Sequence, residues 1–164
     1  MILFNRVLDK SVHWIFILVF YVTAATLFAQ TDPVIDIVDV NAAVVGKYEK
    51  YEIRFHIEKA DFDNPYNPEE IDVSGIFRAP SGKECNQFGF YDNHQGRDIW
   101  KVRFAANETG TWSYRLIAQT PSGNTATQLF EFQVSDSDYH GWINVSPDNP
   151  HYFMHDDGTS FYAV

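Results

Sequence analysis

The feature that most constrains the fold is an eight-residue run in which apolar and polar side chains alternate strictly. In Tyr51-Glu52-Ile53-Arg54-Phe55-His56-Ile57-Glu58 every odd position is apolar and every even position is polar. Successive side chains of a strand point to opposite faces, so this pattern predicts a β-strand with one buried face. A single strand cannot bury that face alone, and the chain therefore has to supply partner strands.

Four further segments alternate in the same way, at 73–79, 100–104, 112–118 and 130–134, and the segments at 34–40 and 87–91 complete the set of expected strands. Turn-forming groups lie between them, at 80–82, 92–96, 107–110 and 121–124. About seven short alternating strands with such turns predict an all-β fold, an immunoglobulin-like antiparallel β-sandwich at residues 30–134. Trp100, Trp112 and Tyr114 alternate cleanly and are expected in its core. Tyr114 or Trp112 is also the candidate for an aromatic corner of this fold.

Residues 1–29 have the pattern of a secretory signal peptide, which would form a helix before its removal. Arg6 and Lys10 precede an apolar run from Trp14 to Ala29, and cleavage is expected after Ala29. The alternative is a retained anchor, but sixteen helical residues span only about 24 Å of a hydrocarbon core about 30 Å thick. We therefore expect a secreted or periplasmic protein with no stable membrane anchor after cleavage.

Charge and cysteine content narrow the possible partners. The formal net charge of −10 disfavours binding to phosphate backbones, so nucleic acid is not expected as a partner. Cys85 is the single cysteine and cannot form an internal disulfide. Its neighbours Glu84 and Asn86 offer no base, which favours a structural thiol over a nucleophile. Stability must then come from a core rich in aromatic residues, which make up 16% of the chain.

The pattern changes after Val134. Residues 135–140 form a short polar linker, and residues 141–164 contain two or three short strand-like segments. This tail ends on the apolar run Phe161-Tyr162-Ala163-Val164, which would leave a strand edge unprotected. We expect residues 141–164 to be the truncated start of a second domain, with an exposed apolar end.

Four stretches carry a resemblance to a known family: 77–83, 89–92, 100–104 and 108–114, with Glu108-Thr109-Gly110-Thr111-Trp112 in the last. They resemble a bacterial β-sandwich family of unknown function (DUF 5060), whose members precede (β/α)8 barrels of apiosidase-like glycoside hydrolases. The resemblance implies a non-catalytic accessory domain of a secreted glycoside hydrolase. It also implies that the partner is a C-terminal catalytic barrel of the same polypeptide, of which this chain holds only the beginning. No catalytic residue can be carried over, because the positions that would match lie in the missing barrel.

Exposed aromatic side chains are the candidates for contact with polysaccharide. Phe88, Phe90, Tyr91 and Trp142 neighbour loops or the linker, and aromatic faces stack on the apolar faces of sugar rings. Packing in the core or at a domain interface is the competing interpretation. Two other functions stay open, a carbohydrate-binding module and a stand-alone secreted surface or adhesion domain. The short linker favours the accessory role, because tethered modules usually hang on longer linkers.

Metal sites were weighed and not favoured, and no cofactor is expected. The loop from Asp61 to Asp72 carries the oxygen-bearing residues that calcium prefers: Asp61, Asp63, Asn64, Asn67, Glu69, Glu70 and Asp72. Pro65 and Tyr66 break the spacing of a calcium-binding loop, which favours a solvated acidic loop. His151 and His155 would lie about 13 Å apart on a strand, too far for one metal ion.

Overall fold

The structure is a computed structural model, and it describes residues 32–94 and 96–162. Contacts within the chain divide it into two units, residues 1–30 and 31–164, and the described residues belong to the second. The predicted signal-peptide helix lies outside the described residues. The part of the chain that is described contains no helix long and apolar enough to cross a membrane.

The described fold is all-β, as predicted. Its strands are β1 (Val34–Val40), β2 (Val44–Gly46), β3 (Lys50–Glu58), β4 (Asp72–Arg78), β5 (Glu84–His94), β6 (Arg97–Ala105), β7 (Gly110–Thr120), β8 (Gly123–Ala126), β9 (Phe130–Ser135), β10 (Ile143–Val145), β11 (Phe153–His155) and β12 (Ser160–Phe161). Strands occur at all seven segments that were predicted as strands. The two additional strands before residue 136, β2 and β8, are too short to show an alternating pattern.

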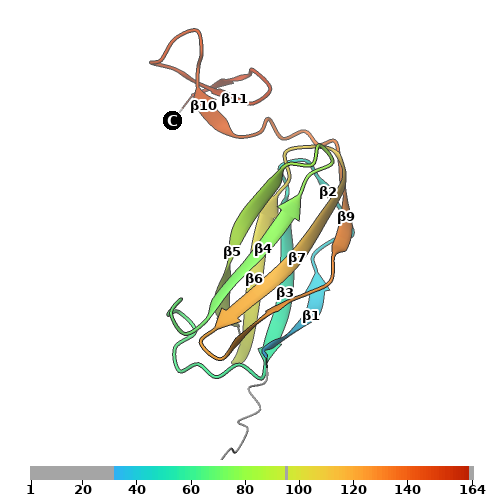
Figure 1. Cartoon of the computed structure of the whole chain (residues 1–164). Helices are drawn as coiled ribbons and strands as arrows, with labels where there is room; N and C mark the ends of the chain where they lie inside the picture. Colours follow the sequence, from blue (N-terminus) through green and yellow to red (C-terminus); the bar gives the residue numbers. More distant parts are fainter. Residues whose placement is uncertain (1–31, 95, 163–164) are drawn as a thin grey trace, which may run out of the picture. The chain divides into compact units, whose positions relative to one another are not determined.

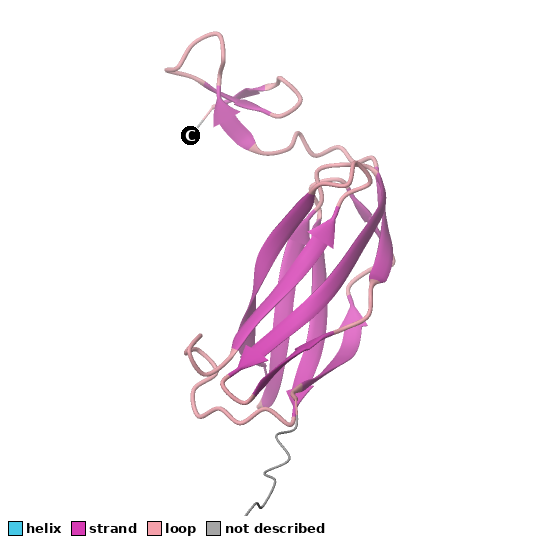
Figure 2. Cartoon of the chain, in the orientation of Figure 1, coloured by secondary structure: helices cyan, strands magenta, loops and turns pink. Residues whose placement is uncertain are grey.

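The first nine strands form the sandwich, in the hydrogen-bonding order β1-β3-β6-β5-β4-β7-β9-β2, with β8 pairing to β7 (Figure 1). Neighbours pair antiparallel except β2 and β9, which run parallel. Strand β5 belongs to both sheets: Glu84–Phe88 pair with β4, and the following residues from Gly89 pair with β6. Figure 2 shows the long strands of the sandwich in two layers, one in front of the other.

The core between the layers is mainly aromatic. The ring of Phe77 stacks on that of Phe104 with centroids 4.1 Å apart, and Tyr51 stacks on Phe132 at 4.0 Å. The hydroxyl groups of Tyr51 and Tyr114 bond to each other, and burial raises the pKa of both. Buried rings of this size contribute strongly to stability, so the sandwich does not need a disulfide.

The aromatic corner is formed by Trp112. Its indole Nε1 donates a hydrogen bond of 2.9 Å to the backbone carbonyl of Glu108, four residues upstream. Tyr114 instead bonds to Tyr51 inside the core. Of the two candidates, Trp112 is therefore the one whose side chain bonds to the upstream backbone.

The tail forms a separate three-stranded antiparallel sheet in the order β10-β11-β12. None of the residues from 139 to 162 is buried. The turn between β11 and β12 is closed by Thr159. Its backbone N–H and its hydroxyl donate hydrogen bonds of 2.9 Å and 2.7 Å to the carboxylate of Asp157. The tail is therefore held together by polar contacts and backbone pairing, without a core of its own.

Candidate functional site

The candidate site lies where β5 changes sheets. Val73 of β4 and Gly89 of β5 lie side by side there, and a Cβ built on Gly89 would come within 2.8 Å of Cγ1 of Val73. Only glycine allows this close approach, after which β5 leaves β4 and joins β6. A hollow of about 340 Å³ opens at this point, between the parting strands and the loop at residues 59–71.

The loop over the hollow is ordered by its own side chains. The carboxylate of Glu70 accepts hydrogen bonds of 2.8 Å from the backbone N–H groups of Asp63 and Asn64, and one of 2.9 Å from Asn67 Nδ2. These bonds favour the ionised carboxylate and lower the pKa of Glu70. Glu70 therefore acts inside the loop, and the acidic sequence here serves loop structure.

Aromatic rings line the hollow from the surface to the core. Tyr66 of the loop meets Tyr91 edge to face at 5.5 Å, and Tyr91 meets the buried Trp100 at 5.6 Å. A hydrogen bond to Asp98 is the main cause that raises the pKa of Tyr91, and it fixes the phenol ring from its hydroxyl end. At the rim, the side chain of Phe88 is 75% exposed and that of Tyr66 is 70% exposed.

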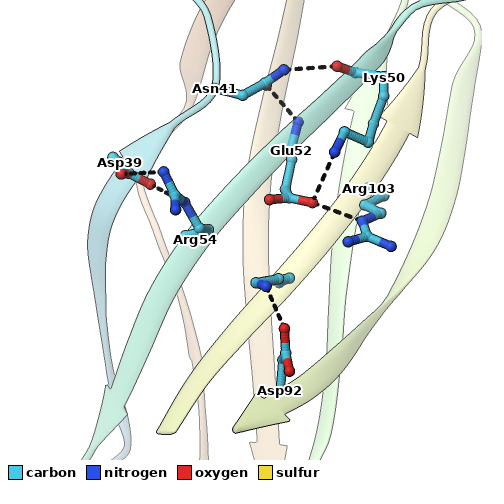
Figure 3. A network of polar contacts seen from close by, with 8 residues as sticks. Asp39, Asn41, Lys50, Glu52, Arg54, Asp92 and Arg103 are labelled. Carbon is cyan, nitrogen blue, oxygen red and sulfur yellow. Dashed lines mark hydrogen bonds and ion pairs between the residues drawn. The ribbon is translucent and has the colours of Figure 1, made fainter. Parts of the chain in front are cut away.

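Phe90 lines the same hollow, and the Arg103 guanidinium lies over its ring, 4.9 Å from the centroid. Arg103 Nε, on β6, also donates a 2.7 Å hydrogen bond to Glu52 Oε2 on the neighbouring strand β3 (Figure 3). Burial alone would raise the pKa of Glu52, but its bonds with Arg103 and Lys50 outweigh burial and lower it. Arg103 therefore connects the ring of Phe90 with the ion pairs between β3 and β6.

Further ion pairs also connect neighbouring strands (Figure 3). Arg54 forms two hydrogen bonds of 2.6 Å with Asp39 across β1 and β3, and Lys101 pairs with Asp92 across β6 and β5. Just after β1, the Asn41 side chain donates a hydrogen bond to the backbone carbonyl of Lys50 and accepts one from the backbone N–H of Glu52. The charged side chains named here are therefore paired with other side chains of the sandwich.

Trp142 lies apart from the other predicted aromatics. It lines a second hollow of about 280 Å³ together with Tyr48 and Arg103. The rings of Tyr48 and Trp142 meet edge to face at 6.0 Å. The four predicted residues therefore divide into two groups, since Phe88, Phe90 and Tyr91 share one hollow and Trp142 belongs to another.

A second candidate site is the contact between the sandwich and the tail, here called the tail anchor and formed by Tyr48, Gly141, Trp142 and Asp156. The carboxylate of Asp156 accepts a 3.1 Å bond from the Trp142 backbone N–H and a further bond from the Tyr48 hydroxyl. Tyr48 has a positive φ of 65°, an uncommon conformation for a residue with a side chain. Gly141 has a φ of 92°, and a Cβ there would come within 2.8 Å of Tyr48 and of Asp156.

Sequence reasoning missed Tyr66 and Tyr48. Tyr66 stands in Asn64-Pro65-Tyr66-Asn67-Pro68, where flanking prolines hold a large ring at the surface of a loop. That pattern was a usable signal. Tyr48 lies in the short connection between β2 and β3, and nothing in its neighbours indicates the turn that presents its ring.

The residues weighed as metal ligands take other roles where the structure describes them. His155 Nδ1 lies 3.3 Å from the carbonyl of Gly141, and the backbone N–H of His151 donates a 3.0 Å hydrogen bond to Asn149 Oδ1. Throughout residues 32–94 and 96–162, no group of three or more histidine, cysteine, aspartate or glutamate side chains is placed to hold a metal ion.

The fold and its hollows define an antiparallel β-sandwich domain with exposed aromatic side chains at one bend of the sheet. Residues 44–119 match the model of the family described as "Domain of unknown function (DUF5060)". The resemblance drawn from the four stretches above is confirmed.

A solved structure from Bacteroides vulgatus ATCC 8482, described as a "putative glycoside hydrolase", has the same fold over 73% of this chain, with a TM-score of 0.54 and 24% sequence identity. The chain spans only 21% of the length of that protein. No curated protein sequence matches the chain.

Proposed function

We propose that this chain contributes the non-catalytic accessory domain of a secreted glycoside hydrolase, and that its tail leads into the catalytic domain. The observation that carries the proposal is the tail sheet, which has no core of its own although it is rich in large apolar residues. The solved structure described as a "putative glycoside hydrolase" shares the fold of this chain, which spans 21% of its length, and this likeness supports the proposal at the level of fold.

The described part of the tail exposes many large apolar side chains for its length. Its exposed large apolar side chains are Tyr139, Trp142, Ile143, Val145, Tyr152, Phe153 and Tyr162. Contiguous apolar surface of this kind marks an interface, and unpaired strands favour association with further strands or helices. A catalytic barrel that follows in the same polypeptide would cover these residues and complete their packing.

The sandwich is attached to the tail tightly enough to orient such a domain. The backbone N–H of Lys47 donates a 2.8 Å bond to the carbonyl of Ser135, and the Ser137 hydroxyl bonds back to the carbonyl of Lys47. The tail anchor then fixes Trp142 against Tyr48. These contacts hold the linker against the sandwich, so it orients the tail in a way that a flexible tether would not.

The coding sequence beyond the codon for Val164 tests the proposal directly. The expected result is an open reading frame long enough for a (β/α)8 barrel, about 250 residues. A stop codon directly after Val164 in the native gene would overturn the proposed connection.

The non-catalytic character of the chain is tested separately. The purified 164-residue chain is assayed on a set of aryl glycosides, next to a sample denatured by heat. No hydrolysis above the denatured control is expected, because glycoside hydrolysis normally needs two opposed carboxyl groups about 5 to 9.5 Å apart across a bound sugar. Turnover by the folded chain would contradict the proposal.

A second function, a carbohydrate-binding module, is favoured by one observation. The hollow at the bend of β5 is lined by Phe88 and Tyr66, which are 75% and 70% exposed. The two roles are compatible, since one uses the tail and the other uses the hollow.

A further inference from the structure

We propose that the hollow between the loop at 59–71 and the bend of β5 is a binding site for a neutral polysaccharide, with Phe88 and Tyr66 as the stacking surfaces. The inference deepens the proposed function, because it gives the accessory domain a ligand of its own. It stands on the geometry of the hollow and does not depend on the tail.

The first argument is the exposure of the two rings. Phenylalanine is among the residues most often buried, yet the side chain of Phe88 is 75% exposed, on a well-paired strand of a sandwich that buries many other rings. Its register neighbour on β4 is Ser74, so the outward direction of Phe88 follows from the pairing of the strands. Tyr66, 70% exposed, presents a second ring from the loop.

The second argument is preorganisation. Tyr66 packs against Tyr91, Tyr91 packs against Trp100, and Trp100 is buried in the core. The loop that carries Tyr66 is closed by the bonds to Glu70. A ligand that stacks on rings already held in place loses less conformational entropy on binding, which raises affinity.

The third argument is the chemistry of the rim. Asp72 and Tyr91 line the hollow together with the exposed rings of Phe88 and Tyr66. A carboxylate and a phenol next to aromatic faces suit a ligand with many hydroxyl groups and an apolar ring face, as in a pyranose. The net charge of −10 disfavours uronic acid polymers and so points to a neutral chain.

The size of the hollow fits a short stretch of such a chain. Its volume of about 340 Å³ lies near the lower end of the range for small-molecule sites, about 300 to 1,000 Å³. Two of its lining residues, Phe88 and Tyr66, are exposed to solvent. We expect a site for one or two sugar units of a longer chain.

The test is affinity electrophoresis of the full chain in gels that contain barley β-glucan, xylan or galactomannan, each a soluble neutral polysaccharide, with polygalacturonate as the charged comparison. We expect at least one neutral polymer to retard the chain. The double variant Tyr66→Ala and Phe88→Ala should lose at least tenfold in affinity, whereas Phe88→Trp should keep binding because it retains a stacking face. Leu129→Ala, which removes an equally exposed apolar side chain elsewhere on the sandwich, is the matched control.

A second measurement separates a binding role from a structural one. Titration of the retarding polymer, cut to short oligosaccharides, into ¹⁵N-labelled chain should shift amide signals at 65–73 and 88–91 and leave those of the tail unchanged. Binding that survives the double variant, shifts confined to other residues, preference for polygalacturonate, or no retardation by any of the three neutral polymers would each overturn the proposal. These results leave the proposed function intact, since that depends on the tail and on the gene beyond Val164.

Discussion

The sandwich and the tail are both antiparallel β-structures, but they are held together by different forces. The sandwich buries a continuous set of aromatic rings, with Phe77, Tyr51 and Trp112 among its fully buried side chains. The tail has three short strands and no buried residue, and carboxylates such as Asp156 and Asp157 supply its side-chain contacts. Polar contacts in water contribute little net stability, whereas buried apolar area contributes much. We therefore expect the sandwich to be much more stable than the described part of the tail.

The largest effect is expected from removing a central ring of the sandwich. Phe77 is fully buried and stacks on Phe104 at 4.1 Å and on Tyr114 at 5.6 Å. Phe77→Ala should lower the free energy of unfolding by about 3 to 5 kcal/mol, because it leaves a cavity among rigid rings. Urea denaturation followed by far-ultraviolet circular dichroism measures this. A loss below about 1 kcal/mol would mean that the aromatic core is not the main source of stability.

Glycine substitutions at positive φ should act differently in the two regions. Gly141→Ala introduces a Cβ within 2.8 Å of Tyr48 and of Asp156, whereas a Cβ at Gly82, with a similar φ of 87°, meets only an Arg78 nitrogen at 4.0 Å. Both changes strain the backbone by about 1 to 2 kcal/mol, but only the first crowds the tail anchor. We expect Gly141→Ala to abolish the nuclear Overhauser contacts between the Tyr48 and Trp142 rings. Gly82→Ala should preserve them, and equal behaviour of the two variants would refute the anchor.

The pH dependence of the tail follows from Asp156. Bonds from the Trp142 backbone N–H and then from the Tyr48 hydroxyl lower its pKa below the ordinary 3.8. A carboxyl with a lowered folded pKa stabilises the folded tail above the unfolded value, and this contribution is lost as the pH falls through the folded pKa. The tail anchor should therefore loosen below about pH 3.8.

Tyr48→Phe tests the origin of the lowered pKa of Asp156, because it removes the hydroxyl that bonds to this carboxylate. The pKa of Asp156, followed by ¹³C carboxyl resonances, should rise toward 3.8 in the variant. Asp157, whose pKa is lowered by His140 and Thr159, serves as the internal control and should not move. An unchanged Asp156 titration would show that the tyrosine does not reach it in solution.

The smallest effect is expected from an apolar side chain of the tail. Phe153 is as bulky as Phe77, yet its side chain is 49% exposed. Phe153→Ala should change the free energy of unfolding by no more than about 0.5 kcal/mol, because the ring has little packing to lose. The same urea experiment measures it, and a loss comparable with that of Phe77→Ala would mean that the tail is part of the core.

Alternation of side chains was enough to predict the sandwich, because burial on one face imposes period two on every long strand. The run at 51–58 became β3, with Tyr51, Ile53 and Phe55 buried as the pattern required. Strands β2 and β8 escaped detection because three or four residues cannot establish a period.

The candidate site was only partly predictable. Phe88, Phe90 and Tyr91 were identified as candidates, but the change of sheets at Gly89 that brings them to one hollow is a tertiary event without a local signal. Whether Phe88 faces solvent depends on its pairing with Ser74, which no property of the strand itself decides. Tyr66 and Trp142 likewise owe their positions to a folded loop and to the tail anchor.

Hydrogen exchange of the full chain, followed by mass spectrometry, tests the difference between the two regions most directly. Amides of β3, β6 and β7 should exchange only through global unfolding, while those of β10, β11 and β12 should exchange orders of magnitude faster, by local opening. This result would establish a self-sufficient sandwich and a tail that lacks its partner. Exchange of both regions at one common slow rate would contradict the account, because the tail would then be stabilised within this chain.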